Sequence, residues 1–349
     1  MKRQEFERVY LMLLLCVGFL TQIVSNSRGQ QLSPLDEIRA RYARWYATDT
    51  AQDIECFWGF RKDLNPKHES GKQKRFLKLN KNTLEVSPVL SEEQFQQFKN
   101  RFGCDLWGLA LSHGGDLLAV NVSSRTLLES GIRVDIHLIQ MASGQAEVLV
   151  ADGWNNSPTC FSPDGEYLAY YSTDARMDVN PNATLPIGAG RLVNVRTKEV
   201  KTFTEPFMSV GSWAMTVSPD WLDNNRVLFR AMSTDFDFIK ASVNKIEDCE
   251  ECLGSKYCPY VAVADLSTGK VQRFFMPGGH CPPWIAIDRP KSRIYLNEGT
   301  NRRKQQIIRV DFNLENPTVV FEGGIPTSMK MVNGVLKYKI GSKTYQISD

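Results

Sequence analysis

The sequence predicts an all-β protein built from repeated antiparallel sheets. Three observations support this prediction: one stretch reads as a tight β-hairpin, weaker copies of it recur along the chain, and most copies are followed by a second hairpin signal. The copies recur at about 40–50 residues, which is a typical spacing for repeated four-stranded sheets. The 349 residues suffice for one large all-β domain or for two small ones.

The clearest hairpin is TCFSPDGEYLAYYS, at residues 159–172. Pro163 fixes φ at one turn position, Asp164 bonds to its own backbone, and Gly165 accepts a positive φ. The second strand, residues 167–172, consists almost entirely of residues that favour β-structure. We therefore expect this strand to be buried on both faces.

Weaker copies of both hairpins recur along the chain. The first hairpin returns at residues 109–120 with Gly-Gly at the turn, 216–229 with a longer turn, 286–296 in a degenerate form, and 331–338 with an Asn-Gly turn. The second hairpin signal stands at residues 77–85, 138–149, 193–201 and 264–272. The earliest of these signals indicates a further sheet whose own first hairpin has diverged.

The segment FSPDGEYLAY, residues 161–170, closely resembles the repeat signature of the TolB-like (WD-repeat-like) β-propeller family, and the resemblance covers residues 102–349. It implies a β-propeller of five or six four-stranded blades, because a blade buries its faces only against neighbouring blades. The chain departs from this family in an insertion around residues 249–258 and in a helical N-terminal region. We see no α/β domain of the TolB type before the propeller, so the resemblance does not imply TolB's own role.

Residues 1–27 read as an export signal, with a basic start, a largely apolar run over residues 9–24, and small residues near 25–27. An uncleaved N-terminal anchor is the alternative, and it would be the only contact with a membrane. A lipidated Cys16 is less favoured, because no small residue stands directly before it. We expect the mature protein to work outside the cytoplasm, in a periplasmic or extracellular location.

Residues 28–103 are expected to hold short helices and the diverged first blade, and residues 104–349 the remaining blades. Ser33 followed by Pro34 predicts the start of a helix. The apolar face expected for this helix is Leu35, Ile38, Tyr42 and Trp45.

A capping box formed by Ser91 and Gln94 predicts a second helix, which Gly103 ends. Its apolar face is Phe95, Phe98 and Phe102. We expect both helices to pack on the propeller, and a groove for a partner is the alternative. The net charge of +3, with its Lys and Arg scattered along the chain, implies no nucleic acid and no acidic membrane as partner.

Eight cysteines are present, and loss of Cys16 with the signal would leave seven. An oxidising compartment favours disulfides, and an odd number leaves one thiol over. Cys160 is the best candidate for the free thiol, since it lies in a predicted core strand. The disulfide candidates are Cys56, Cys104, Cys249, Cys252, Cys258 and Cys281.

Propeller topology places the loop into a blade's first strand on the same face as the loop between its second and third strands. Cys104 and Cys281 lie on loops of the first kind, and Cys249, Cys252 and Cys258 lie in an insertion of the second kind. We expect disulfides there. The alternatives are a zinc site completed by Cys281 or His280, and a redox Cys-x-x-Cys pair.

The same face should carry the candidate binding residues. They are Trp107, Trp213 and Trp284 before first strands, Asp174 and Asp235 after second strands, and His280. Filling between blades is an equally good interpretation of the Trp residues, and the Asp residues are more typical of loop turns than of a calcium site. Sequons at Asn121 and Asn182 follow predicted strands and are expected to be exposed.

We predict an exported, non-catalytic binding or interaction protein, with a disulfide-stapled insertion on its ligand-facing side. No nucleophile elbow, phosphate loop or dinucleotide fingerprint is present in the sequence. The alternative is a propeller enzyme that uses a metal or a redox-active cysteine cluster on the same face. We expect no cofactor, with zinc or calcium as the alternative. The sequence does not name the protein or small-molecule partner.

Overall fold

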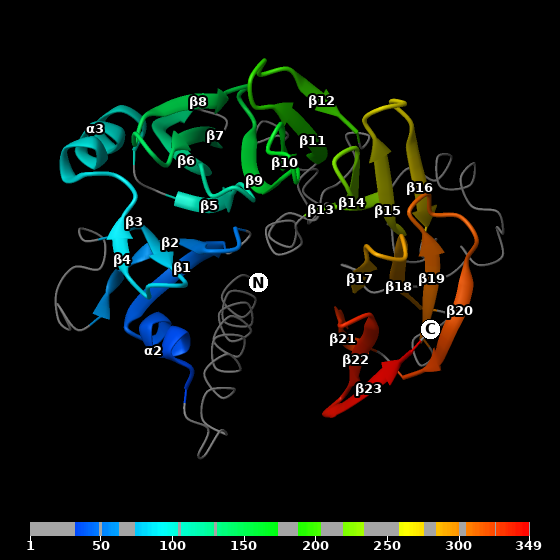
Figure 1. Cartoon of the computed structure of the whole chain (residues 1–349). Coiled ribbons are helices and arrows are strands. Elements are labelled where there is room, and N and C mark those ends of the chain that lie inside the picture. Colours follow the sequence, from blue (N-terminus) through cyan, green and yellow to red (C-terminus); the bar gives the residue numbers. More distant parts are fainter. Residues whose placement is uncertain are drawn as a thin grey trace, which may run out of the picture. The chain divides into compact units, whose positions relative to one another are not determined.

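The computed structural model of the chain is all-β, as predicted (Figure 1). It describes residues 32–48, 51–62, 74–103, 106–128, 131–173, 188–203, 219–233, 258–275, 284–299, 305–324 and 326–348. Two compact units are present, one of residues 1–43 and 61–67 and the other of residues 44–60 and 68–349. The sheets and cores below belong to the second unit, apart from the outer ends of the first two strands.

The strands form antiparallel meanders that follow one another along the chain. Meander 1 holds β1 (Tyr42–Thr48), β2 (Ile54–Arg61), β3 (Arg75–Asn80) and β4 (Val86–Pro88). Meander 2 holds β5 (Leu106–Leu111), β6 (Leu117–Leu128), β7 (Gly131–Gln140) and β8 (Ala146–Val150). Meander 3 holds β9 (Asn155–Phe161), β10 (Tyr167–Thr173), β11 (Gly188–Asn194) and β12 (Val200–Thr202). A short parallel contact of β7 with β9 joins meanders 2 and 3 in one eight-stranded sheet.

Three further meanders complete the described chain. Meander 4 holds β13 (Asp220–Trp221), β14 (Arg226–Ser233), β15 (Cys258–Asp265) and β16 (Val271–Phe275). Meander 5 holds β17 (Ile285–Asp288), β18 (Arg293–Gly299), β19 (Gln305–Asp311) and β20 (Thr318–Gly323). Meander 6 has three strands among the described residues, β21 (Pro326–Val332), β22 (Val335–Ile340) and β23 (Lys343–Ile347). Each copy of the first hairpin found in the sequence therefore falls in a separate meander.

The predicted hairpin turn of meander 3 is present. Phe161 pairs with Leu168, and Gly165 between them has a φ of 77°. The Ser162 hydroxyl donates to Asp164 at 2.6 Å and accepts from the Tyr167 amide at 2.9 Å. This side-chain bonding within the turn holds the two strands at one register.

The second hairpins of several meanders close with a shared device. The first turn residue is Asn80, Asn194, Asp265 or Asp311, and its side-chain oxygen accepts from backbone amides two to four positions ahead. Gly269, at the end of one such turn, has a φ of 68°. These local bonds explain why short polar motifs in the sequence predict the turns well.

The cores lie between successive meanders, because the second strands of meanders 2 to 5 send alternate side chains to opposite neighbours. In β10, Leu168 and Tyr170 pack on meander 2, whereas Ala169 and Tyr171 pack on meander 4. In β18, Ile294 and Leu296 pack on meander 4, and Tyr295 packs on meander 6. The first strands β5, β9 and β13 contact one another in sequence, as do β17 and β21.

Helix α3 (Glu92–Phe102) forms as predicted, with its capping box and with Gly103 as its C-cap. Phe95 and Phe98 are buried in the core shared by meanders 1 and 2.

Helix α2 (Pro34–Ala40) begins at Ser33 as predicted, but it is shorter than expected and has no buried residue. The expected apolar face is wrong, since Tyr42 and Trp45 belong to strand β1. Residues 1–27 lie outside the described part of the chain.

Gly190 marks a close approach between meanders 3 and 4. A Cβ atom at this position would lie 2.5 Å from Cδ1 of the buried Phe229 ring. We expect Gly190→Ala to lower the free energy of unfolding by about 1–3 kcal/mol, because the ring has no room to move. In a Phe229→Leu background the same change should cost less, so chemical denaturation of the two single variants and the double variant should show non-additive effects. Additive effects would contradict the close approach.

His137 on β7 is buried, and its ring centroid lies 4.1 Å from that of Phe102. Burial, and then the Arg101 guanidinium, lowers the pKa of His137 to about 4. Below about pH 6.5 the His137 side chain is protonated in the unfolded chain but stays neutral in the folded chain. The free energy of unfolding therefore falls as the pH drops from about 6.5 to about 4. We expect this loss to reach about 3 kcal/mol.

Thermal or urea unfolding of the wild type and of His137→Phe between neutral pH and pH 4 tests this expectation. The variant should lose stability less steeply with acid, because a phenyl ring takes up no proton. Parallel pH profiles for the two proteins would contradict the assigned shift.

Candidate functional site

The antiparallel meanders give each sheet two different edges. Both names refer to the ends of the strands and not to the outermost strands. At one end, which we call the turn edge, hairpins join the first strand to the second and the third to the fourth. At the opposite end, which we call the loop edge, connections join the second strand to the third and one meander to the next. The expected binding residues belong to connections of the loop edge.

Most of those residues lie outside the described part of the chain, namely Asp174, Trp213, Asp235 and His280. Trp107 lies on β5, where only its backbone is described. Trp284, just before β17, is 45% exposed. Its carbonyl oxygen accepts a hydrogen bond from the Asn297 amide at 3.1 Å. Proximity of these residues to one another stays a prediction.

Of the seven cysteines after residue 27, two are free thiols in the structure, and one of the other five, Cys258, lies on a described strand. Cys104, Cys249, Cys252 and Cys281 lie outside the described residues, and Cys258 begins β15 opposite Ser233. Cys160 is a free thiol, as predicted, and its Sγ donates to the Pro219 carbonyl at 2.9 Å. Cys56 is also free, and it is buried on β2 in the core between meanders 1 and 2. The expectation that Cys56 forms a disulfide is therefore wrong, since this apolar core surrounds it.

A cluster of polar and aromatic side chains lies where the chain passes from β8 to β9. Asp152 organises it: Oδ1 accepts from the Trp154 amide at 3.1 Å and from Asn156 Nδ2 at 2.9 Å. Its Oδ2 accepts from Arg191 Nη1 at 2.7 Å. The Arg191 guanidinium stands over the Trp154 ring, 4.6 Å from its centroid. We call this group the Trp154 cluster; it is the best-described group of polar and aromatic residues at the loop edge.

The Trp154 cluster continues inward as a layer of buried polar atoms. Tyr170 lies opposite Arg191 on β11, and Ser172 lies opposite Asn156 on β9, so all four share one face of meander 3. Ser172 Oγ and Asn156 Oδ1 are buried and have no hydrogen-bond partner among the described residues, whereas the Tyr170 hydroxyl has the Arg191 guanidinium as a polar neighbour. Burial, and then the Asp152 carboxylate, raises the pKa of Tyr170, so its hydroxyl stays protonated. Such atoms need water or a ligand as partner.

Meander 2 contributes Asn121 to this layer. Its side chain is 1% exposed, and Nδ2 donates to the Asn156 carbonyl at 3.0 Å. The expectation of an exposed sequon at Asn121 is therefore wrong, because the side chain faces meander 3. Asn182 lies outside the described residues.

Sequence reasoning missed Trp154, Asp152 and Arg191. A signal was available: Trp154 stands directly before the first strand β9, as Trp284 stands directly before β17, and Trp107 is the second residue of β5. Arg191 had no such signal, because only the pairing of β10 with β11 brings it beside Asp152.

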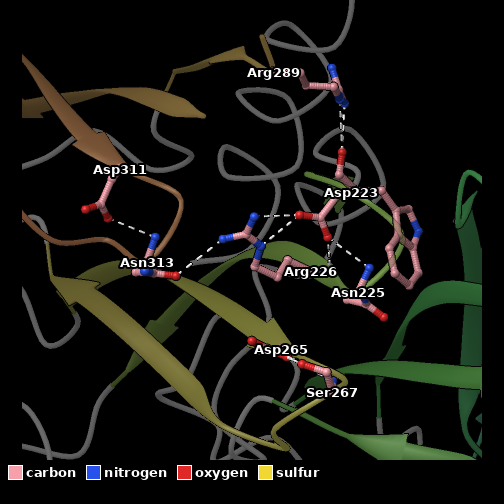
Figure 2. Close-up of polar contacts among 9 residues, drawn as sticks. Asp223, Asn225, Arg226, Asp265, Ser267, Arg289, Asp311 and Asn313 are labelled. Atoms are coloured by element: carbon pink, nitrogen blue, oxygen red, sulfur yellow. Dashed lines mark hydrogen bonds and ion pairs between the residues drawn. The ribbon is translucent and has the colours of Figure 1, made fainter. Parts of the chain in front are cut away.

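A second polar network lies at the turn edge, between meanders 4 and 5. Figure 2 shows Arg226 between Asp223 and Asn313. The Asp223 carboxylate accepts from Arg226 Nη2 at 2.6 Å, and Arg226 Nη1 reaches Asn313 Oδ1 at 3.4 Å. Arg289 donates twice to the Trp221 carbonyl, at 2.8 and 3.2 Å. Because these groups are paired with one another, we interpret the network as a tie between neighbouring meanders.

Neither a metal site nor a membrane-spanning helix is found in the part of the chain that the structure describes. No group of three or more His, Cys, Asp and Glu side chains is placed to hold an ion there. No described helix has the length and the apolar character needed to cross a bilayer.

No protein-family model matches the sequence, and no curated protein matches it either. Solved structures do resemble the fold. A structure from a study of two prolyl endopeptidases has a TM-score of 0.54 at 11% identity, and the match covers 90% of this chain and 43% of that chain. This likeness shows a shared fold alone.

Two further solved structures are similar at lower scores. The β-propeller domain of the Trilobed protease from Pyrococcus furiosus has a TM-score of 0.48 at 9% identity, covering 88% of this chain and 82% of that chain. TolB from Acinetobacter baumannii has a TM-score of 0.38 at 12% identity, covering 92% and 82%. The expected TolB-like family therefore has the support of neither a family model nor a close relative.

The Asp152–Arg191 ion pair should matter more than an exposed one. Their side chains are 29% and 14% exposed, whereas those of the similar pair Glu147–Lys198 are 47% and 44% exposed. We expect Asp152→Asn to lower the free energy of unfolding by about 1–3 kcal/mol and Glu147→Gln by less than about 1 kcal/mol. Urea unfolding of the three proteins measures the difference. Equal losses in the two variants would contradict a special role for Asp152.

Proposed function

We propose that the chain is an exported, non-catalytic β-propeller that binds its partner at the loop edge. Six successive antiparallel meanders, packed face to face through alternating side chains, support a propeller of six blades. The apolar run over residues 9–24 supports export. The TolB-like repeat signature at residues 161–170 is consistent with both.

The observation that carries the proposal is the layer of unpartnered polar atoms behind Trp154. Along one face of β10, Leu168 and Tyr170 belong to the apolar core with meander 2, and the next residue on that face is the buried polar Ser172. Interfaces and ligand sites characteristically combine an aromatic anchor with a few polar groups that await partners. In the polar network at the turn edge, by contrast, Arg226 and Asp223 satisfy each other. The loop edge is therefore the side that we assign to the partner.

The cysteine insertion between β14 and β15 is proposed to border the same site. Residues 234–257 join the second and third strands of meander 4, and residues 276–283 lead into meander 5. Disulfides among Cys249, Cys252, Cys258 and Cys281, with Cys104 as a further candidate, would make this border rigid.

Binding is tested with arrays of oligosaccharides and of peptides, using the full mature chain. We expect at least one probe to bind, and Trp154→Ala to weaken that probe by about tenfold or more, as for an interface hot spot. Arg226→Gln, at the turn edge, is the matched control and should bind like the wild type. If no probe binds, or if the Arg226 variant alone loses binding, the loop edge is the wrong surface.

The enzyme alternative is separated by metal analysis and by a panel of chromogenic hydrolase substrates. Stoichiometric zinc or calcium, lost on mutation of Cys249 or Asp174 and accompanied by turnover, would overturn the non-catalytic proposal.

Thiol chemistry distinguishes the cysteines without a ligand. Burial raises the pKa of both Cys56 and Cys160 to about 12, so neither thiol should react in the native protein. We expect maleimide to label these two and one of the other five mature cysteines after denaturation without reductant, because five cannot all pair within the chain. The remaining four should be labelled only after reduction. Mass spectrometry of digests assigns the labels. Labelling of both Cys249 and Cys252 without reductant would argue against a stapled insertion.

A further inference from the structure

Meander 6 differs from the others in the face that it turns away from the core. Met329, Leu336 and Tyr338 pack on meander 5. The opposite face carries two cross-strand rows, Ser328–Lys339–Thr344 and Lys330–Lys337–Gln346, and next to the hairpin turn the pair Val332–Val335. We call the six side chains of the two rows the lysine face. In meanders 2 to 5, by contrast, apolar side chains of both faces join the cores.

The strands of meander 6 carry four lysines and no acidic residue, since residues 326–348 contain neither Asp nor Glu; Glu322 and Asp349 flank this range. Lys330 and Lys337 stand directly opposite each other, an arrangement that disfavours strand pairing because like charges repel. Lys330, Lys337 and Lys339 form no ion pair with another described residue that would offset this repulsion. An anionic partner laid over this face would remove the repulsion.

The outer edge of the same meander is also open. Strand β23 pairs with β22 alone among the described residues, whereas meanders 1 to 5 each add a fourth strand at this place. Its side chains from Lys343 to Gln346 are exposed, and Tyr345 is 40% exposed. An edge strand of this kind presents unpaired backbone groups that can accept another strand.

We infer that meander 6 accepts an extended acidic segment of a partner protein as its fourth strand. Neighbouring strands lie about 4.8 Å apart, so Cα atoms of β22 and of an added strand are about 10 Å apart. Lys337 and Lys339 can reach carboxylates across this distance, over the uncharged Gln346 and Thr344. Because side chains alternate, the carboxylates must stand at every second position of the segment. Backbone bonds supply affinity, and the lysines select the charge pattern.

This surface is separate from the Trp154 cluster, so the inference does not depend on the proposed function. Binding at the lysine face should survive Trp154→Ala, and array binding at the loop edge should survive changes in meander 6.

The test uses the full chain and a short fluorescent peptide with Glu at alternate positions and Val or Thr between them. We expect it to bind about tenfold more tightly than the same peptide with Gln for Glu, and more weakly as salt rises. The double variant Lys337→Gln, Lys339→Gln should lose this preference. Lys198→Gln with Lys270→Gln, which removes two exposed lysines elsewhere, is the matched control and should retain it.

A peptide with alternate backbone N-methyl groups separates strand addition from simple charge attraction, and it should fail to bind. Equal affinity for the Glu and Gln peptides, unchanged affinity of the N-methylated peptide, or no binding at millimolar peptide would each overturn the inference. So would amide-exchange protection of β23 in the free protein equal to that of β22, because another segment would then already pair with the edge. A concentration-dependent dimer that the acidic peptide does not dissociate would assign the edge to a second copy of the chain.

Discussion

Apolar packing between the faces of successive meanders is the interaction on which the rest of the structure depends. A four-stranded meander has no core of its own, and meanders 2 to 5, which have two apolar faces, each lie between two others. The alternation in β10, with Leu168 and Tyr170 on one side and Ala169 and Tyr171 on the other, satisfies both neighbours with one strand. The hairpin turns, the capping box of α3 and the turn-edge network maintain this arrangement and do not create it.

The two edges of the sheets follow from the same constraint. Hairpins at the turn edge are short, and their Asx and Ser side chains satisfy the backbone locally. Polar atoms near the β8–β9 connection at the loop edge include several without a partner among the described residues. Polar groups of the Asp223–Arg226 network at the turn edge are thus paired, whereas several near the β8–β9 connection are not.

The strands and turns were largely predictable because their signals are local. A Pro-Asp-Gly or Asn-Gly turn between β-favouring residues specifies its hairpin regardless of what surrounds it. Helix α2 was predicted less well: Ser33 and Pro34 mark its start correctly, but the pairing of β1 with β2 takes up Tyr42 and Trp45. Tertiary pairing overrode the helical pattern there. The predictions for Cys56 and Asn121 were wrong for a related reason, because the burial of both residues depends on a neighbouring meander. The ion pair of Asp152 with Arg191 could not be predicted, because it requires the register of β10 and β11.

The second strands contribute side chains to two cores at once, and this restricts where the chain can change in length. One residue inserted within β10 would move every following side chain to the opposite face and exchange Tyr170 with Tyr171 between two cores of different shape. Both cores would have to repack at once, whereas an insertion between β14 and β15 disturbs neither. Extra length is therefore expected in the connections, and β14 and β15 keep one continuous register although 24 residues join them.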